Sequence, residues 1–198
     1  SGVVAAKAPV GATQLASVES ASLATIVRRT LKVSDNLAAE VIARQLAIAA
    51  GEPGSFAGAS AAIKSWLSAR GLWAAGMRIV DGSGLSMRAR ATPRVLAKAI
   101  LLSLDDPRLA AVASGLPVAG RTGTLKDRFN DKQEAAGRGN VHAKTGTLIG
   151  IAALAGYLTT ADGDRLVFAA VANSARGRTT AYNWLDRSAA ALVRCGCR

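Results

Sequence analysis

Lys144-Thr145-Gly146-Thr147-Leu148 lies near the start of the stretch that decides the fold, because strand-like and helical segments follow one another from there to the end of the chain. The turn Ala-Asp-Gly-Asp at 161–164 predicts a hairpin between the two segments beside it. A helix that returns across an antiparallel sheet, after a series of helices, indicates an α+β fold. The expected strands span 141–147, 151–159 and 165–173, and the expected closing helix spans 179–193.

Upstream of this stretch, apolar side chains recur at the spacing of helices. Thr92 and Pro93 have the residue types that are favoured at the N-cap and the first position of a helix. Residues 115–140 are rich in Gly and polar side chains, which predicts a long surface loop, and long loops are often functional. The expected helices span 22–32, 37–50, 55–70, 92–104 and 106–113, and a short strand is expected at 77–80.

The composition is that of a globular chain with a strong positive charge. The 198 residues suffice for one domain or a large part of one, and 50% of them are hydrophobic. The formal net charge of +12 is a common property of nucleic-acid-binding proteins. However, the basic residues are dispersed and aromatic residues make up only 4%, so no nucleic-acid partner is expected. A basic surface that faces an anionic polymer of the cell envelope explains the charge equally well.

The chain ends and the cysteines carry weaker signals. No apolar run reaches about 18 residues, so no membrane span is expected. The absence of an initiator Met predicts that the chain begins at a processed or engineered point, which disfavours Ser1 as an N-terminal nucleophile. Cys195 and Cys197 are neighbours that form at best a strained mutual disulfide. Pairing with a cysteine elsewhere in the protein, or two free thiols, are the alternatives.

Ser34-Asp35-Asn36 lies 110 positions upstream of Lys144, at the entrance of an expected helix. Because Ser34 and Asn36 are two residues apart, both side chains can face one cleft. A hydroxyl there can pass a proton to a leaving group, and a carboxamide can both donate to and accept from a substrate amide. Helix capping is the alternative interpretation, because Ser, Asp and Asn are favoured cap residues.

Lys144, Thr145 and Gly146 fall on the first expected strand. A Lys ammonium offers a positive charge to a substrate carboxylate, and a Thr hydroxyl adds a hydrogen bond. Gly146 has no side chain, so a substrate backbone can lie against the strand, and an exposed strand edge can pair with a peptide. The alternative is an ordinary strand that happens to contain a lysine.

Taken together, these segments resemble the C-terminal part of class C low-molecular-mass penicillin-binding proteins, the D-alanyl-D-alanine carboxypeptidases and endopeptidases. Ser-Asp-Asn and Lys-Thr-Gly are the second and third signatures of penicillin-interacting serine enzymes. The likeness covers about residues 14–194 and implies their penicillin-binding and serine β-lactamase-like fold. The matching segments are 19–23, 31–37, 80–86 (Val-Asp-Gly-Ser-Gly-Leu-Ser), 116–120, 123–125 and 142–148.

The resemblance implies a role for each residue of the motifs. Ser34 would relay a proton, Asn36 would hold the substrate, and Lys144 with Thr145 would bind the terminal carboxylate of a peptidoglycan stem peptide or a β-lactam. Beside Gly146, the backbone N–H of Thr147 would form half of an oxyanion hole. Asp81 belongs to a loop that borders the cleft in this family, although Asp-Gly-Ser-Gly is also ordinary turn chemistry. No cofactor and no metal are implied.

The first signature, the nucleophilic Ser-x-x-Lys, is absent, because none of the seven lysines has a Ser three residues before it. We therefore expect 1–198 to be the C-terminal portion of a single DD-peptidase catalytic domain that cannot form an acyl-enzyme alone. The expected partner is an N-terminal fragment of the same protein that carries Ser-x-x-Lys. The implied location is outside the cytoplasm of a bacterium, in the periplasm or cell wall.

Two other functions compete with a serine-type D-Ala-D-Ala carboxypeptidase, a hydrolase. A class A β-lactamase also contains Ser-Asp-Asn, but it needs a deacylating Glu, and no acid between the motifs stands in a Glu-x-x-x-Asn setting. A catalytically dead protein that binds or scaffolds peptidoglycan peptides would keep the groove without the nucleophile. Carboxypeptidase and endopeptidase activity, and the oligomeric state, stay open at this point.

Overall fold

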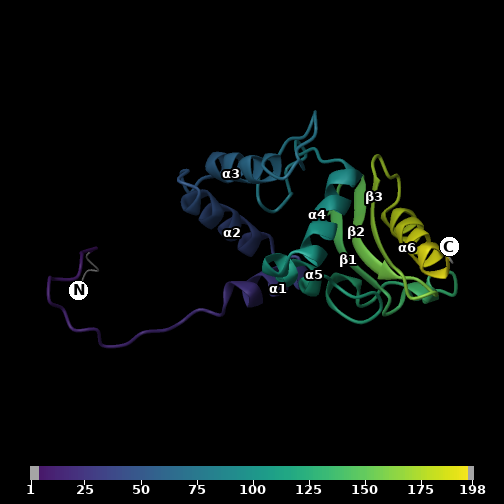
Figure 1. Ribbon diagram of the computed structural model, residues 1–198, viewed down its shortest axis with the longest axis horizontal. Helices are drawn as coiled ribbons and strands as arrows, with labels where there is room; N and C mark the ends of the chain where they lie inside the picture. Colours follow the sequence, from purple (N-terminus) through teal and green to yellow (C-terminus); the bar gives the residue numbers. More distant parts are fainter. Residues whose placement is uncertain (1–4, 196–198) are drawn as a thin grey trace.

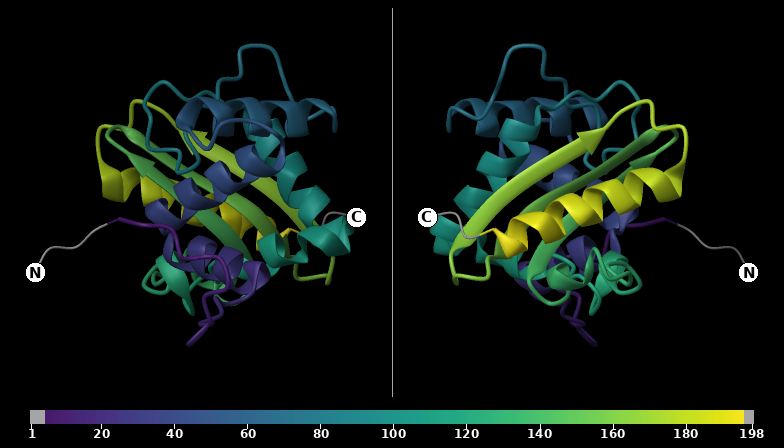
Figure 2. Two further views of the ribbon diagram at one scale, coloured as in Figure 1. Left: turned by 90° about the vertical axis from the view of Figure 1, so that its left-hand side faces the viewer. Right: turned by 90° about the vertical axis from the view of Figure 1, so that its right-hand side faces the viewer.

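The computed structural model describes residues 5–195 and confirms the α+β fold. The described residues form a three-stranded antiparallel sheet in the order β1-β2-β3, with helix α6 along one face and helix α4 against the other (Figures 1 and 2). The bounds are Val141–Leu148 for β1, Ile151–Thr159 for β2, Arg165–Ala172 for β3, Pro93–Asp105 for α4 and Arg178–Arg194 for α6.

The main core lies between the sheet and α6. Alternate residues of β2 face α6, and among them Leu154 and Leu158 are fully buried against Leu185 of the helix. Full burial of one such side chain stabilises the fold by about 1.5–3 kcal/mol. Gly156 lets β1 and β2 approach, because a Cβ there would collide with the backbone oxygen of His142. The close contact at Gly156 therefore helps to fix β1 against β2.

Three helices, α1 (Leu23–Val33), α2 (Asn36–Ala49) and α3 (Phe56–Ser68), precede α4 and begin where the sequence predicted them. Figure 1 shows α2 and α3 side by side, apart from the sheet. Side-chain oxygens at the N-caps satisfy the first free N–H groups of each helix. These N-cap residues are Ser22, Asp35, Ser55 and Thr92.

Two expectations for the connecting segments were wrong. Residues 77–80 form no strand, and only an isolated bridge joins Arg78 to Arg90. The segment 115–140 is not a surface loop throughout, because Leu116, Leu125 and Phe129 are fully buried. Their irregular spacing matches no helix or strand period, so the pattern did not reveal that this segment closes the core. Its turns are η2 (Gly123–Leu125) and η3 (Ala135–Gly137).

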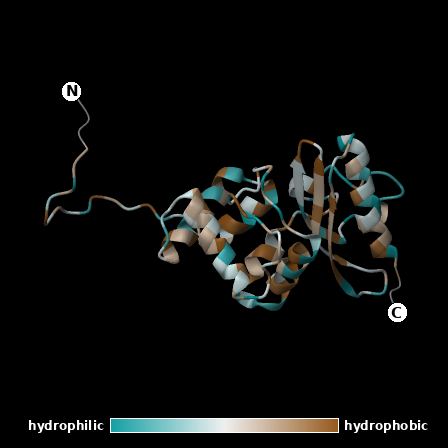
Figure 3. Ribbon diagram, turned by 90° about the horizontal axis from the view of Figure 1, so that it is seen from above, coloured by the Kyte–Doolittle hydropathy of each residue, from teal (hydrophilic) through white to brown (hydrophobic). Residues whose placement is uncertain are grey.

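The segment predicted as one helix over 106–113 divides into a 3₁₀ turn, η1 (Pro107–Leu109), and α5 (Ala110–Gly115). Residues 5–22 have no regular structure and extend away from the body in Figure 1. Figure 3 shows hydrophobic residues both on the strands and on the helices beside them. Within residues 5–195, no helix is long and apolar enough to cross a membrane. Cys195 is disulfide-bonded, and Cys197 lies outside the described residues.

Candidate active site

Ser34 occupies the junction between α1 and α2 in the left-handed conformation, with φ 57° and ψ 51°. This backbone conformation costs an L-residue roughly 1–2 kcal/mol, and such strain concentrates at functional sites. The N–H of Asp35 donates to the oxygen of Thr30 at 3.0 Å, and the Asp35 side chain accepts from the N–H of Ala38 at 2.9 Å. The sharp turn thus places Ser34 between the end of α1 and the start of α2.

The three residues of the Ser-Asp-Asn motif therefore have different structural positions. Asp35 is the N-cap, as the capping interpretation requires, whereas Ser34 and Asn36 both line one cavity. Asn36 is the first residue of α2 and is exposed, so its carboxamide is available to a ligand. Capping by Asp35 and a cleft lined by its neighbours are consequently compatible.

Lys144 connects the two motifs. Its Nζ donates to Ser34 Oγ and to the backbone oxygen of Thr145, both at 2.7 Å. Burial lowers the pKa of the Lys144 ammonium from its ordinary value. The structure thus brings together two motifs that are separated by 110 residues, through a direct hydrogen bond.

The outer edge of β1 becomes free beside Lys144. Val141 and Ala143 use their outward backbone groups to pair with Ala119 and Pro117 of the preceding segment. Because the direction of backbone groups alternates along a strand, and the register with β2 is uninterrupted, Thr145 and Thr147 also present theirs outward. The Thr147 N–H therefore points toward the edge where a peptide could pair.

Hydroxyl contacts hold the two threonines of this edge. Thr145 Oγ1 lies 2.9 Å from Thr124 Oγ1, and Thr147 Oγ1 lies 2.8 Å from the Tyr182 hydroxyl of α6. The guanidinium of Arg128 covers the Tyr182 ring at 4.5 Å. These three contacting residues were not assigned a role from the sequence, because nothing in their local pattern shows that distant segments meet β1.

A buried ion pair fixes Arg128 in turn. Its Nη2 lies 2.6 Å from Asp186 Oδ1, and the exposed fractions of the two side chains are 13% and 4%. Since each charge neutralises the other, Arg128 contributes an oriented side chain to the cavity more than a free charge. The pair therefore attaches the segment after η2 to α6, behind Tyr182.

These side chains enclose a cavity of about 580 Å³ between α1, α2, β1 and the loop 82–85. Six of the predicted site residues line it, among them Gly146, whose added Cβ would lie 3.3 Å from Ala153 Cβ. Thr30, Leu31, Ala39 and Ile151 are among the apolar or small residues that complete the wall. The predicted residues that line the cavity are Ser34, Asn36, Lys144, Thr145, Gly146 and Thr147.

Asp81 is the one predicted site residue that is not among those lining this cavity. Its Oδ1 accepts from the N–H of Gly84 at 2.6 Å, and its Oδ2 accepts from the N–H of Ser86 at 2.8 Å. Both carboxylate oxygens thus brace the loop internally, as turn chemistry predicts. The loop reaches the cavity through its neighbours 82–85.

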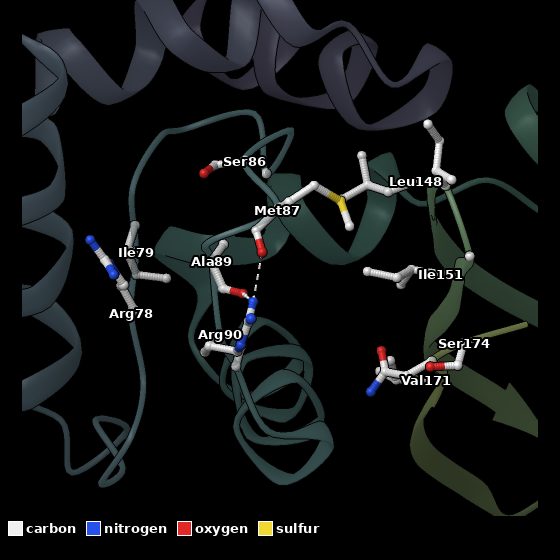
Figure 4. Close-up of a pocket in the computed structure, with 15 residues that line it drawn as sticks. Arg78, Ile79, Ser86, Met87, Ala89, Arg90, Leu148, Ile151, Val171 and Ser174 are labelled. Atoms are coloured by element: carbon white, nitrogen blue, oxygen red, sulfur yellow. Dashed lines mark hydrogen bonds between the residues drawn. The ribbon is translucent and has the colours of Figure 1, made fainter.

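A second hollow, of about 530 Å³, adjoins the first and shares Gly84, Leu148 and Ile151 with it. In Figure 4, Met87 reaches across from the loop side toward Leu148, and Val171 lies on the strand side. Arg90 donates to the backbone oxygens of Met87 and Ala89, both at 2.7 Å, which keeps the loop side in place. The site therefore continues along the end of β1 as a largely apolar surface.

His142 precedes Lys144 by two residues and packs away from the cavity. Its ring stacks on Tyr157 with centroids 4.7 Å apart, and its Nδ1 lies 3.1 Å from the Tyr157 hydroxyl. Burial, followed by the nearby charge of Lys32, lowers the pKa of His142. It is a strand residue near the site, as expected. Among residues 5–195, no group of three or more His, Cys, Asp or Glu is placed to hold a metal ion.

Comparison with known proteins gives one consistent result. Residues 1–192 match the model of the D-Ala-D-Ala carboxypeptidase 3 (S13) family. A carboxypeptidase of Mycobacterium tuberculosis is 41% identical over 98% of this chain and 42% of its own length. A carboxypeptidase of Mycolicibacterium smegmatis is 40% identical over 94% of this chain and 41% of its own length. The chain thus spans about two fifths of the length of these curated relatives.

A solved structure extends the likeness to the fold. Penicillin-binding protein 4 of Haemophilus influenzae, in complex with a β-lactam, superposes with a TM-score of 0.73 at 26% sequence identity. The superposition covers 83% of this chain and 40% of that protein. The chain therefore has part of a penicillin-binding fold, as its motifs implied.

Proposed function

Because the chain belongs to the D-Ala-D-Ala carboxypeptidase 3 (S13) family, we propose that it is part of a serine D-Ala-D-Ala carboxypeptidase that acts on peptidoglycan stem peptides and binds β-lactams. The observation that carries the proposal is the 2.7 Å hydrogen bond from Lys144 Nζ to Ser34 Oγ in a cavity that Asn36 also lines. Motif residues from the helical and strand regions thereby form one site.

In the proposed reaction, a serine Oγ attacks the carbonyl carbon of the penultimate D-Ala. The amide C–N bond breaks, terminal D-Ala leaves with a proton on its nitrogen, and water later hydrolyses the ester. Since Lys144 donates to Ser34 Oγ, the hydroxyl proton of Ser34 is directed elsewhere and can pass to the leaving nitrogen, while Ser34 Oγ takes up the proton that the attacking serine loses. Ser34 thus acts as the proton relay.

The same edge of β1 suits the rest of the substrate. The Lys144 ammonium and the Thr145 hydroxyl offer a charge and a hydrogen bond to the terminal carboxylate. The outward N–H of Thr147 is aimed where an oxyanion would develop, and Asn36 can hold a substrate amide. The peptide would add to the free strand edge by main-chain hydrogen bonds.

We assign the nucleophile to a segment that carries Ser-x-x-Lys, from the same protein as this chain. Leu37, Val41 and Ile48 lie on one side of α2 and are all exposed, so this helix has an apolar surface available to such a segment. A peptidoglycan substrate supports a location outside the bacterial cytoplasm, in the periplasm or cell wall, which is part of this proposal.

The test is intact-mass spectrometry of the native preparation with and without a fluorescent penicillin. We expect a species with Ser-x-x-Lys to gain the mass of the penicillin, and that adduct to be labelled in competition with D-Ala-D-Ala peptides. If neither this chain nor any accompanying polypeptide gains the adduct, the protein is a peptide-binding scaffold and the enzymatic proposal fails. Rapid turnover of the penicillin would instead favour a β-lactamase.

A further inference from the structure

Glu40 attaches the loop 81–86 to α2. Its Oε1 accepts from the backbone N–H of Ser83 at 3.0 Å and from the Ser83 hydroxyl at 2.7 Å. Glu40 follows Asn36 by one helical turn, so both side chains lie on the same side of α2. The helix that supplies a site residue therefore also holds the loop that forms part of the cavity wall.

The loop and the helix are in close contact at Gly82. A Cβ on this residue would lie 2.5 Å from Ala43 Cβ and 2.8 Å from the backbone oxygen of Ala39. Only glycine lets the loop backbone rest on α2 at this separation. Because Asp81 braces the loop internally, the loop can move as one unit, and the Glu40 carboxylate is the side chain that ties it to the helix.

The charge of Glu40 suits this task. Burial raises the pKa of its carboxyl, but the two hydrogen bonds from Ser83, the nearby backbone N–H of Gly82 and the charge of Arg44 together outweigh that effect and leave the pKa below its ordinary value. Glu40 is thus an anion at neutral pH, and hydrogen bonds to an anion are stronger than neutral ones. Its Oε2 is buried without a hydrogen-bond partner, so the two bonds that Oε1 accepts from Ser83 hold the carboxylate in place.

Resting on the proposed function, we propose that Glu40 is a positioning residue that sets the distance between the loop 82–85 and the β1 edge on which the peptide lies. A loop that is free to move away from α2 would weaken substrate contacts made equally in the ground state and the transition state. Loss of such uniform contacts raises KM and leaves kcat nearly unchanged. Glu40 therefore affects substrate binding through Ser83 and not through contact with the reacting atoms.

The experiment compares Glu40→Ala, Glu40→Gln and Gly82→Ala in the native protein, with Glu52→Gln as the matched control, because Glu52 is exposed after the far end of α2. Release of D-Ala from a stem-peptide analogue gives KM and kcat, and amide exchange reports the Ser83 and Ser86 N–H groups. We expect Glu40→Ala to raise KM about tenfold and to change kcat less than about threefold. Exchange should become faster at the Ser83 amide, which Glu40 binds, and stay slow at the Ser86 amide, which Asp81 holds inside the loop.

The other variants make the result specific. Gly82→Ala, which separates loop and helix by another route, should give the same rise in KM, whereas Glu40→Gln keeps an acceptor oxygen and should restore most of the wild-type KM. An unchanged KM in an active Glu40→Ala protein overturns the inference, as does an equal loss in all kinetic constants. A wild-type protein that releases no D-Ala contradicts the proposed function instead, so the two failures are distinguishable.

Discussion

The sheet half of this molecule (β1–β3 with α6) and its helical half (α1–α3) differ in how completely they bury their apolar side chains. Between the sheet and α6, apolar side chains such as Leu154, Leu158 and Leu185 are almost completely buried. Along α2, in contrast, Leu37, with 74% of its surface exposed, and Ile48 face outward. The sheet half therefore carries its own core, whereas the helical half exposes the kind of surface that a protein normally buries.

The site lies where the two halves meet, and that position explains its construction. Lys144 on the sheet side contacts Ser34 on the helical side, and Lys32 of α1 donates to the oxygen of Leu116 at 2.6 Å, close to where that segment meets β1. A rigid strand thus supplies the groups that we propose to hold a carboxylate, while a capped helix junction supplies the proposed proton relay.

The largest expected effect tests the contrast between the halves. Leu185→Ala should lower the free energy of unfolding by about 2–5 kcal/mol, because it leaves a cavity in a closed core. The matched change Leu37→Ala should alter it by less than about 0.5 kcal/mol in this chain alone. Urea unfolding monitored by circular dichroism measures both. A large loss for Leu37→Ala in the native preparation would show that another polypeptide covers α2.

The next effect concerns the contact that joins the halves. Lys144→Met should slow acylation by penicillin about 100-fold or more, because a preorganised charge at the reacting site is lost. Ser34→Ala should also slow it. The double variant should lose less than the sum of the two single losses in activation free energy, since the two residues act through one hydrogen bond. Fluorescent-penicillin labelling rates give the cycle. Fully additive losses would mean that Lys144 and Ser34 work independently.

A smaller effect reports the strain at Ser34. Ser34→Gly should raise the free energy of unfolding by up to about 1 kcal/mol, because glycine adopts φ 57° without a steric penalty. The same change should reduce the rate of penicillin acylation, since the hydroxyl is removed. Thermal unfolding and labelling of one preparation measure the two together. A variant that is both less stable and less active would contradict strain at this residue.

The smallest effect is a dependence of stability on pH. Burial lowers the pKa of Lys144 in the folded protein below the ordinary value of 10.5. Between these two values the unfolded chain binds more protons, so the free energy of unfolding should rise with pH in that window. Below the window the cost of burying the ammonium is fully present. Urea midpoints at alkaline pH, compared with Lys144→Met, measure this slope, and a variant with the wild-type slope would exclude Lys144 as its source.

Local signals in the chain predicted most of the secondary structure. Apolar spacing indicated the helices, and cap residues such as Asp35 and Thr92 marked where they begin. The strand-sized runs and the turn at 161–164 predicted the β2–β3 hairpin, and the two strands do pair as antiparallel neighbours. These features are local, since they depend on residues within one or two turns of one another.

The misses involve residues whose partners are far away in the chain. Nothing near Tyr182 indicates that its hydroxyl meets Thr147, and nothing near Glu40 indicates that its carboxylate holds Ser83. Asp81 differs from these residues, because its partners are the nearby N–H groups of Gly84 and Ser86, as the turn interpretation of its motif implied. The buried Leu125 and Phe129 were missed because irregular segments bury residues without a repeating period.

The amino-acid order alone therefore settles the chemistry that is available and the helices and strands that carry it, because side-chain type, capping and periodicity are local properties. Tertiary packing decides which of these groups meet. It places Ser34 within hydrogen-bond distance of Lys144 across 110 residues, and it turns Glu40 and Tyr182 toward the loop and the strand that they hold. The physical reason is that these contacts depend on how buried faces fit together, and that fit involves the whole chain at once.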